Sequence, residues 1–249
     1  MFDAIEMGSQ TPASQPAASP GLAAVAQGAE ATIYRTRLFG DQDVAIKQRL
    51  PKRYRIPELD EHLNRSRIIA EARALARAWS LPHVHVPAVY LVDPHRLRLV
   101  LEWIEGLSLR DWLRTRESVE GTTHIAAVLE QVGRMVAAIH AVGLIHGDLT
   151  TSNFIVRESA DRNESTVFVI DFGLAQQYPI QSDTTVEAKA VDLYVLERAL
   201  ASVHVQQAAA YFAQVLRAYE SGSSIENAKL VLRRLDVVRA RGRKRAMIG

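Results

Sequence analysis

The stretch His146-Gly147-Asp148-Leu149-Thr150-Thr151-Ser152-Asn153, followed by Ile170-Asp171-Phe172-Gly173, decides the fold. Between the two motifs lie two short β-prone apolar runs joined by a polar turn, which predicts a β-hairpin. Such a hairpin would bring Asn153 and Asp171 together at one end. Their oxygen atoms suit a hard cation such as Mg²⁺. Asp148 is left free to accept a proton or to orient a nucleophile.

The order and spacing of the two motifs carry more weight than either motif alone. A strand can end in Asp-Phe-Gly by chance, and Asp171 would then be a solvated acid at a turn. Both motifs together are similar to the protein-kinase pair H-R-D-L-x-x-x-N and D-F-G. The chain differs at Gly147, where most kinases carry arginine. The resemblance predicts a catalytic role for Asp148 and metal binding by Asn153 and Asp171.

Composition limits the classes of protein to consider. The chain has 249 residues, 48% hydrophobic and 23% charged, which allows one large domain or two small lobes. The absence of cysteine excludes disulfides and thiolate metal sites, and it fits a reducing compartment. The longest apolar candidate for a membrane span, Ala126 to Ile145, contains Glu130 and Arg134, so no membrane span is expected. The N-terminus lacks the basic start and apolar core of a signal peptide.

The two ends of the chain differ in composition from the middle. Residues 1–20 are rich in Ser, Gln, Ala and Pro, and we expect them to be disordered. The basic tail, residues 239–249, contributes Arg239, Arg241, Arg243, Lys244 and Arg245, whereas the formal net charge of the whole chain is only +2. We expect this tail to be too charged to form a helix easily. Its cations would suit a phosphate backbone or an acidic cleft on a partner.

The N-terminal third of the sequence predicts groups that would contact the phosphates of a nucleotide. Residues 21–38 look like two strands around the turn Gln27-Gly28-Ala29-Glu30-Ala31, where a kinase has its glycine-rich loop. Only Gly28 remains of that pattern, so an ordinary hairpin turn is an alternative. Val44-Ala45-Ile46-Lys47 matches the kinase V-A-I-K strand, in which the lysine contacts the α- and β-phosphates.

A helix over residues 58–79 is predicted by apolar residues at spacings of three to five, including Leu59 and Trp79. Glu71 lies in an alanine-rich part of this helix, where an unpaired carboxylate would be costly. We therefore assign the ion pair Lys47–Glu71. The alternative is an exposed pair between Glu71 and Arg67 on the helix surface.

Two further strands are predicted over residues 86–92 and 96–104, and the second continues into a linker that ends at Gly106. In a kinase such a linker binds the adenine edge. By position alone, Leu101 would guard the pocket, and the Glu102 carbonyl and Ile104 N–H would face the base.

The remaining chain predicts a helical region. Helices are expected over residues 108–114, 122–142, 186–201, 203–219 and 224–238. His140 and His146 are assigned structural roles. Asp192 could fix the backbone of the catalytic turn, or it could be an exposed helix acid. No A-P-E motif follows Gly173, and the short segment argues against loop phosphorylation and against an ordinary peptide groove.

From about residue 21 onward the chain resembles the PRPK-type small atypical kinases, the kinase subunit of the KEOPS (EKC) complex. The residues that carry this resemblance are Gln27-Gly28-Ala29-Glu30-Ala31, Lys47, Glu71-Ala72-Arg73-Ala74-Leu75, His146 to Asn153, Asp171-Phe172-Gly173-Leu174, Lys189-Ala190-Val191-Asp192-Leu193-Tyr194-Val195-Leu196-Glu197 and Arg241-Gly242-Arg243-Lys244-Arg245.

The resemblance implies an α+β, two-lobed kinase-like fold, with a small β-rich N-lobe (21–104) and a reduced helical C-lobe (105–238). It implies ATP with Mg²⁺ or Mn²⁺, Ser/Thr autophosphorylation and ATP hydrolysis. It also implies a role in threonylcarbamoyladenosine modification of tRNA, in the cytoplasm and nucleus. The transferase subunit would bind the C-lobe and a small regulatory subunit the N-lobe, while Arg241, Arg243, Lys244 and Arg245 would contact tRNA or the transferase.

Two alternatives to an active kinase remain. The first is a nucleotide-binding, pseudokinase-like scaffold that positions the transferase subunit and tRNA without turnover. The second is a small-molecule kinase of the aminoglycoside or choline type, which ranks last because no substrate-binding insert is visible in the C-terminal half.

Overall fold

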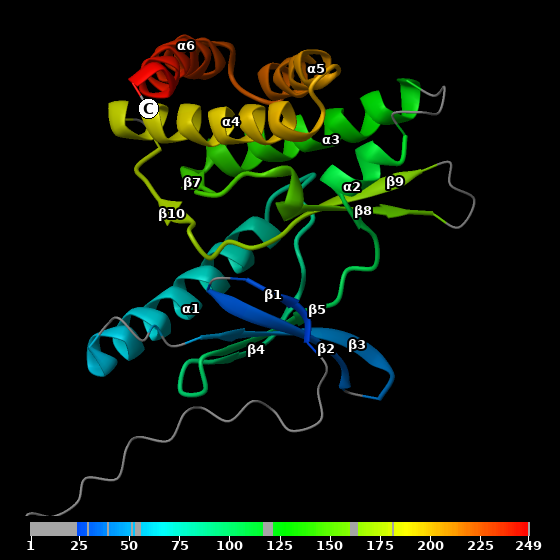
Figure 1. Cartoon of the computed structure of the whole chain (residues 1–249), viewed down its shortest axis with the longest axis vertical. Coiled ribbons are helices and arrows are strands. Elements are labelled where there is room, and N and C mark those ends of the chain that lie inside the picture. Colours follow the sequence, from blue (N-terminus) through cyan, green and yellow to red (C-terminus); the bar gives the residue numbers. More distant parts are fainter. Residues whose placement is uncertain are drawn as a thin grey trace, which may run out of the picture.

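The computed structural model describes residues 24–28, 30–38, 40–50, 52, 56–116, 122–159, 164–180 and 182–248, with only the backbone described for 122 and 243–248. The segment expected to be disordered, 1–20, lies outside the described residues. A β-rich lobe and a helical lobe are stacked along the long axis (Figure 1). In chain order the elements are β1 (Ala24–Gln27), β2 (Ala31–Leu38), β3 (Gln42–Arg49), α1 (Pro57–Trp79), β4 (Val89–Asp93), β5 (Arg98–Glu102), β6 (Leu107–Ser108), α2 (Leu109–Arg114), α3 (Thr122–Ala141), β7 (Leu144–Ile145), the 3₁₀ turn η1 (Thr151–Asn153), β8 (Phe154–Glu158), β9 (Ser165–Val169), β10 (Gln176–Gln177), α4 (Asp183–Val203), α5 (Ala208–Ser221) and α6 (Ile225–Ile248).

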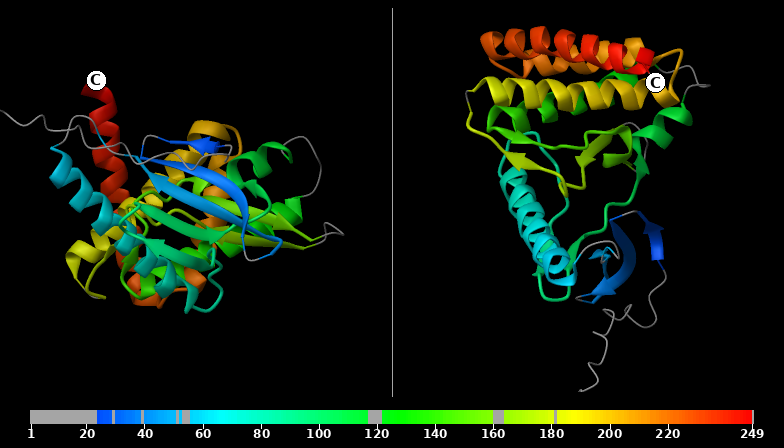
Figure 2. Two further views of the ribbon diagram at one scale, coloured as in Figure 1. Left: turned by 90° about the horizontal axis from the view of Figure 1, so that it is seen from below. Right: turned by 60° about the vertical axis from the view of Figure 1, so that its left-hand side comes forward.

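The N-lobe is built on a five-stranded antiparallel sheet with the strand order β1-β2-β3-β5-β4. Strand side chains alternate between two faces. Val44 and Ile46 of β3 pack with Val100 of β5 in a small apolar cluster. Lys47 and Arg49 therefore point to the other face. Helix α1 lies beside the sheet and extends from it toward the helical lobe (Figure 2).

Helix α1 begins one residue before the predicted position, at Pro57, and its buried face agrees with the prediction only in the middle of the helix. Leu59 and Trp79, expected in the core, are 51% and 59% exposed. Ile68 and Leu75 of the same pattern are buried, as is Glu71, which was expected to need a partner, and Asp60 is buried as well. Asp60 accepts hydrogen bonds from the Lys52 backbone N–H and from another α1 side chain. The inner face of α1 is therefore partly polar, because it contacts polar and charged groups of β3 and of the segment that follows it.

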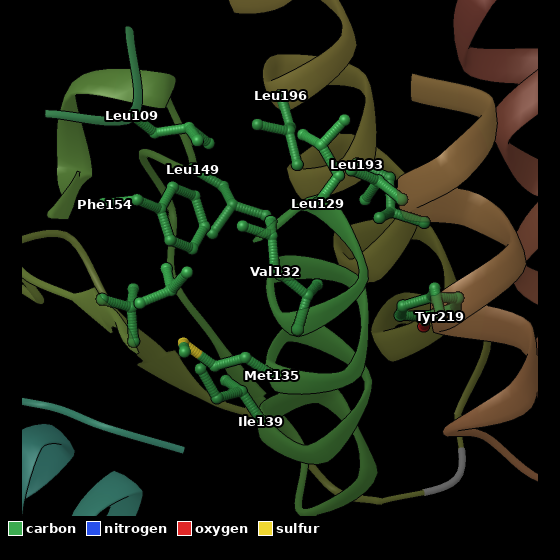
Figure 3. Packing of buried hydrophobic residues seen from close by; sticks show 14 of the residues in the cluster. Leu109, Leu129, Val132, Met135, Ile139, Leu149, Phe154, Leu193, Leu196 and Tyr219 are labelled. Atoms are coloured by element: carbon green, nitrogen blue, oxygen red, sulfur yellow. The ribbon is translucent and has the colours of Figure 1, made fainter. Parts of the chain in front are cut away.

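The C-lobe is organised around α3, which packs on α5, while α4 packs on α6. Leu129, Val132 and Met135 of α3 meet Phe154 of β8 and Leu193 of α4 in one continuous core (Figure 3). Full burial of each such side chain contributes about 1.5–3 kcal/mol. This core includes Leu149 of the catalytic turn and so holds the turn against the C-lobe.

The expectation that the basic tail is not helical is wrong, because α6 continues to Ile248. Acidic residues on α4 neutralise the first tail cations. Both Nε and Nη2 of Arg239 donate to the Glu197 carboxylate, at 2.8 and 2.7 Å, and Arg241 pairs with Glu187. Gly242 permits the close approach of the two helices, since a Cβ there would lie 2.0 Å from the Tyr194 hydroxyl oxygen.

Smaller differences concern element boundaries. The strand expected from residue 86 starts at Val89, because the backbone just before it turns to the C-lobe, where the His85 carbonyl accepts the Val169 N–H at 2.9 Å. The helix expected from residue 203 starts at Ala208, after a turn around His204. Among the described residues, none of the helices is both long and apolar enough to span a membrane.

Candidate nucleotide site

The hairpin predicted between the two motifs is present as β8 and β9, which pair Phe154 with Val169. Just beyond this pair, the Ile170 N–H donates to the Asn153 carbonyl at 2.9 Å. Because the strands are paired at this open end of the hairpin, Asn153, just before β8, and Asp171, just after β9, lie close together. The β8–β9 register therefore sets the relative positions of the amide and the acid.

Asp171 has an uncommon backbone conformation, with φ at 61° in the left-handed region. Its carboxylate Oδ1 accepts from Lys47 Nζ at 2.6 Å and from the Gly173 N–H at 3.1 Å. Burial opposes its ionisation, but Lys47 and the Gly173 N–H outweigh burial, so the pKa of Asp171 lies below its ordinary value. A strained, ionised acid held toward the interlobe region is typical of a functional site.

The ion pair Lys47–Glu71 assigned from the sequence is present, with Nζ 2.6 Å from Oε1. The two side chains are 9% and 1% exposed. Burial alone would favour the neutral amine, but Glu71 and Asp171 together raise the pKa of Lys47 above its ordinary value. The alternative pairing of Glu71 with Arg67 is not found; Arg67 binds Glu30 instead.

Asn153 and Asp148 form a second pair at the catalytic turn. The Asn153 side-chain Nδ2 donates to the Asp148 carbonyl at 2.8 Å and to its carboxylate Oδ2 at 2.9 Å. Both amide hydrogens are thus used, which leaves the Asn153 Oδ1 as the atom available to a ligand. The same bonds fix the orientation of the Asp148 carboxylate.

Asp192 lies beneath the turn as a 1%-exposed carboxylate, not as an exposed helix acid. It accepts hydrogen bonds from the His146 N–H at 2.7 Å and the Gly147 N–H at 2.9 Å. The His140 Nε2 lies 3.3 Å from the same carboxylate. Burial lowers the pKa of His140 despite Asp192, so the imidazole is neutral and acts as a structural group.

His146 also has structural contacts. Its Nε2 lies 3.0 Å from the Ile170 carbonyl, and its Nδ1 accepts the Asp148 N–H at 3.3 Å. The ring packs on Phe172 with centroids 4.8 Å apart. His146 therefore joins the two motifs by a side chain, and its two partners require the tautomer protonated on Nε2.

The turn expected to cover the phosphates joins β1 and β2, and the Gly28 N–H donates to the Ala31 carbonyl at 2.9 Å. Gln27 ends β1, and Ala29 lies outside the described residues. The Glu30 carboxylate does not stand free, because Arg67 and Arg49 bind it. Sequence reasoning missed Arg49; its position two residues after Lys47, on the same strand face, was the available signal.

The linker residues are placed at the end of β5. Leu101 and Ile104 are 8% and 9% exposed. The Glu102 carboxylate accepts from the Ala88 N–H and from Arg157 of β8, both at 3.3 Å, and so contacts both lobes. The roles assigned to these residues toward adenine stay predictions.

After Gly173 the chain is short, as the sequence predicts. It passes through β10, which pairs with β7, and enters α4 at Asp183 behind the N-cap Ser182. A Cβ on Gly147, the residue that stands where most kinases have arginine, would lie 2.4 Å from the Leu174 carbonyl oxygen. The close path of this segment therefore excludes any larger residue at position 147 without rearrangement.

The tail residues lie on α6, which packs on α4. Arg241 pairs with Glu187 of α4. The side chains of Arg243, Lys244 and Arg245 lie outside the described residues.

Comparison with known proteins agrees with this geometry. Residues 22–220 match the model of the protein kinase domain. The EKC/KEOPS complex subunit BUD32 of Chaetomium globosum is 40% identical over 260 residues, covering 94% of each chain. The mouse EKC/KEOPS complex subunit Tp53rkb is 40% identical, over 92% of this chain and 90% of the mouse protein. The Pyrococcus abyssi KEOPS complex subunit Bud32 is 38% identical, over 89% of this chain and 96% of the archaeal protein.

Among solved structures, WaaP in complex with acyl carrier protein has the same fold, with a TM-score of 0.59, 18% identity and coverage of 89% of this chain and 87% of that chain. At that identity the likeness concerns the fold alone. The relatives and the domain match lead to one conclusion: the chain belongs to the protein kinase domain family and, within it, to the BUD32 family of EKC/KEOPS complex subunits.

Proposed function

We propose that the chain binds ATP with a divalent cation between its lobes and transfers the γ-phosphoryl group to a Ser/Thr hydroxyl or to water. The observation that carries this proposal is the meeting of Lys47, Glu71 and Asp171 at 2.6 Å distances, next to the fixed pair Asp148–Asn153. Catalysis of phosphoryl transfer depends mainly on positioning and charge neutralisation, which such a set supplies.

The donor atoms suit Mg²⁺ or Mn²⁺. The Asn153 Oδ1 is left over by the hydrogen bonds of its amide, and Asp171 Oδ2 accepts no hydrogen bond from the described residues. No group of three or more His, Cys, Asp or Glu side chains able to hold a metal occurs among the described residues. A cation would therefore take these two oxygens, with phosphate and water as its other ligands. It would neutralise charge on the β- and γ-phosphates.

The chain's own groups have separate tasks. Lys47 supplies a point charge to the phosphates, and Glu71 keeps its ammonium in place. Asp148 orients the attacking hydroxyl or water and can accept its proton. Asp192, through the backbone of His146 and Gly147, keeps the turn that carries Asp148 in position.

The test is ATP turnover by the purified full-length chain with Mg²⁺, comparing the wild type with Asp148→Ala. We expect turnover to fall by about 10²-fold or more, since general-base or orienting groups contribute about 10²–10⁴-fold. Glu61→Ala, on the exposed side of α1, is the matched acidic control and should leave turnover unchanged. Equal turnover by Asp148→Ala and wild type would reject the enzyme and favour the scaffold alternative. Phosphate release and protein labelling, measured side by side, identify the acceptor.

For the assembly, we propose a KEOPS-type complex, because the relatives bear the names of KEOPS subunits. In it the chain supports threonylcarbamoyladenosine modification of tRNA, with the transferase subunit on the C-lobe and a small regulator on the N-lobe. Arg241 is already paired with Glu187, so Arg243, Lys244 and Arg245 are the proposed tRNA contacts. Replacing the latter three by Gln should weaken tRNA binding in a filter assay and reduce its salt dependence. An unchanged salt slope would exclude the tail from tRNA contact.

A further inference from the structure

Arg49 is a buried cation to which the nucleotide site described above assigns no task. Its side chain is 2% exposed. Nη1 lies 3.3 Å from the Glu30 carboxylate and Nη2 lies 3.5 Å from Glu71 Oε2. A buried guanidinium is costly unless it is paired with carboxylates, so these two acids account for its presence there.

Glu71 is shared between two cations. Its Oε1 accepts from Lys47 and its Oε2 from Arg49. Arg49 follows Lys47 by two residues on β3, so both side chains lie on one face of the sheet. Gly173 makes room for this arrangement, because a Cβ there would lie 3.0 Å from both Arg49 Nη2 and Asp171 Oδ1.

Glu30, on the turn between β1 and β2, binds Arg49 and a second cation. Arg67 of α1 donates to both of its oxygens, at 3.2 and 3.0 Å, and Arg49 contacts one of them. Burial opposes the ionisation of Glu30, but Arg67 and Arg49 outweigh burial and lower its pKa. Strand register adds a backbone tie: Ala31 pairs with Arg49, and the Glu30 carbonyl accepts the Leu50 N–H at 3.2 Å.

Together these contacts form a chain of alternating charges. We name it the ion network; in spatial order its members are Asp171, Lys47, Glu71, Arg49, Glu30 and Arg67. It starts at the acid after β9, alternates between β3 and α1, reaches Glu30 on the turn between β1 and β2, and returns to α1 at Arg67. The three carboxylates balance the three cations, so the network is electrically neutral without a ligand.

We propose that Glu30, Arg49 and Arg67 are positioning residues that hold the β1–β2 turn against helix α1 and Lys47 at the distance required for nucleotide binding. The turn has only one glycine, so the ion network, not loop flexibility, sets its distance from the phosphates. Glu30 then acts on the nucleotide through the turn and not by direct contact. This inference rests on the proposed nucleotide site, which it deepens.

The test uses Glu30→Gln in the full chain, since the Glu30 carboxylate is 45% exposed and its loss should not prevent folding. The matched control is Glu61→Gln. It removes the acid of an exposed ion pair on α1, in which the Glu61 carboxylate lies 2.6 Å from the Arg65 guanidinium. Three quantities are measured: the Kd of a non-hydrolysable ATP analogue with Mg²⁺, amide hydrogen exchange over residues 24–38, and Tm.

We expect Glu30→Gln to raise the Kd about fivefold and to speed exchange in the turn, with a lower Tm because the buried Arg49 keeps only Glu71, whereas Glu61→Gln changes none of these. Arg67→Met, which leaves Arg49 with both of its acids, should raise the Kd and speed exchange with Tm nearly unchanged. The double variant Glu30→Gln/Arg67→Met should be no worse than Glu30→Gln alone, because the contact of Arg67 in the network is with Glu30. This pattern separates positioning from general stability.

Two results would overturn the inference: unchanged exchange in the turn of Glu30→Gln, or effects of Glu30→Gln and Arg67→Met that simply add. If the wild type does not bind the analogue at all, the proposed nucleotide site fails. The exchange measurement still decides whether the ion network holds the turn, so the two failures are distinguishable.

Discussion

Gly147 and Gly40 offer a matched test of how closely the segment after Asp171-Phe172-Gly173 packs on the catalytic turn. Both glycines have left-handed φ values, 83° and 88°. A Cβ on Gly147 would lie 2.4 Å from the Leu174 carbonyl oxygen, whereas a Cβ on Gly40 would meet nothing within 4 Å. The variants Gly147→Ala and Gly40→Ala therefore share their backbone strain and differ in the contact.

The left-handed conformation costs an alanine about 1–2 kcal/mol, and the loss of unfolded-state freedom returns about 0.4–1 kcal/mol in both variants. Only Gly147→Ala must also relieve an overlap with backbone atoms, for which overpacking adds about 1–3 kcal/mol. We therefore expect the free energy of unfolding to fall by about 1–3 kcal/mol more in Gly147→Ala than in Gly40→Ala. For a chain of this size, that corresponds to a Tm lower by roughly 2–12 °C.

Thermal and urea unfolding of the two variants, run beside the wild type, give this difference directly. Turnover should fall in Gly147→Ala alone, because relief of the overlap moves either the turn that carries Asp148 or the segment that follows Asp171. Equal Tm values for the two variants would refute the reasoning, since the shared φ strain would then account for the whole effect.

Three further predictions concern the C-lobe. Asp192→Asn places an amide donor against the backbone N–H groups of the catalytic turn. We expect the free energy of unfolding to fall by about 2–4 kcal/mol and turnover to fall with it. A variant as stable as the wild type would contradict this prediction. Burial lowers the pKa of His140 below its ordinary 6.5, so the unfolded chain binds the proton more readily and the free energy of unfolding should fall as pH drops below 6.5. The variant His140→Gln should flatten the plot of stability against pH in this range. An unchanged plot would exclude His140 as the source of the pH dependence. Gly242→Ala should destabilise the chain although alanine favours helices, because its Cβ would lie 2.0 Å from the Tyr194 hydroxyl oxygen; adding Tyr194→Phe should restore part of the stability, which a double-mutant cycle measures.

Local pattern was enough to predict the catalytic hairpin and most helices, because period and turn residues act over a few residues. Lys47 and Glu71 were also assigned as a pair, since a carboxylate in an alanine-rich helix needs a partner. The inner face of α1 could not be predicted in the same way. Leu59 and Trp79 follow the helical period but are exposed, whereas Ile68 and Leu75 of the same pattern are buried, because the period does not show which part of the helix the rest of the fold covers.

Long-range charge pairing explains the other differences. The tail was expected to be non-helical from its own charge, whereas Glu187 and Glu197 of α4 neutralise its first cations. Glu30 was assigned to the nucleotide because of its place in the turn. Its pairing with Arg49 and Arg67 joins segments far apart in sequence, and no local rule selects such partners.

Helix α4 connects the catalytic turn to the C-terminal helix. Its Asp192 fixes the turn by two backbone hydrogen bonds, and its Glu187 and Glu197 bind the start of the basic tail. These acids lie on one rigid element whose buried side is continuous with the core. A ligand that competes for the tail cations would therefore take Arg239 from Glu197 and Arg241 from Glu187, which keeps Arg234, while Asp192 keeps its own hydrogen bonds. The acids of α4 that pair with the tail thus differ from the acid that fixes the catalytic turn. Loss of the tail contacts should therefore lower the free energy of unfolding and leave turnover largely unchanged.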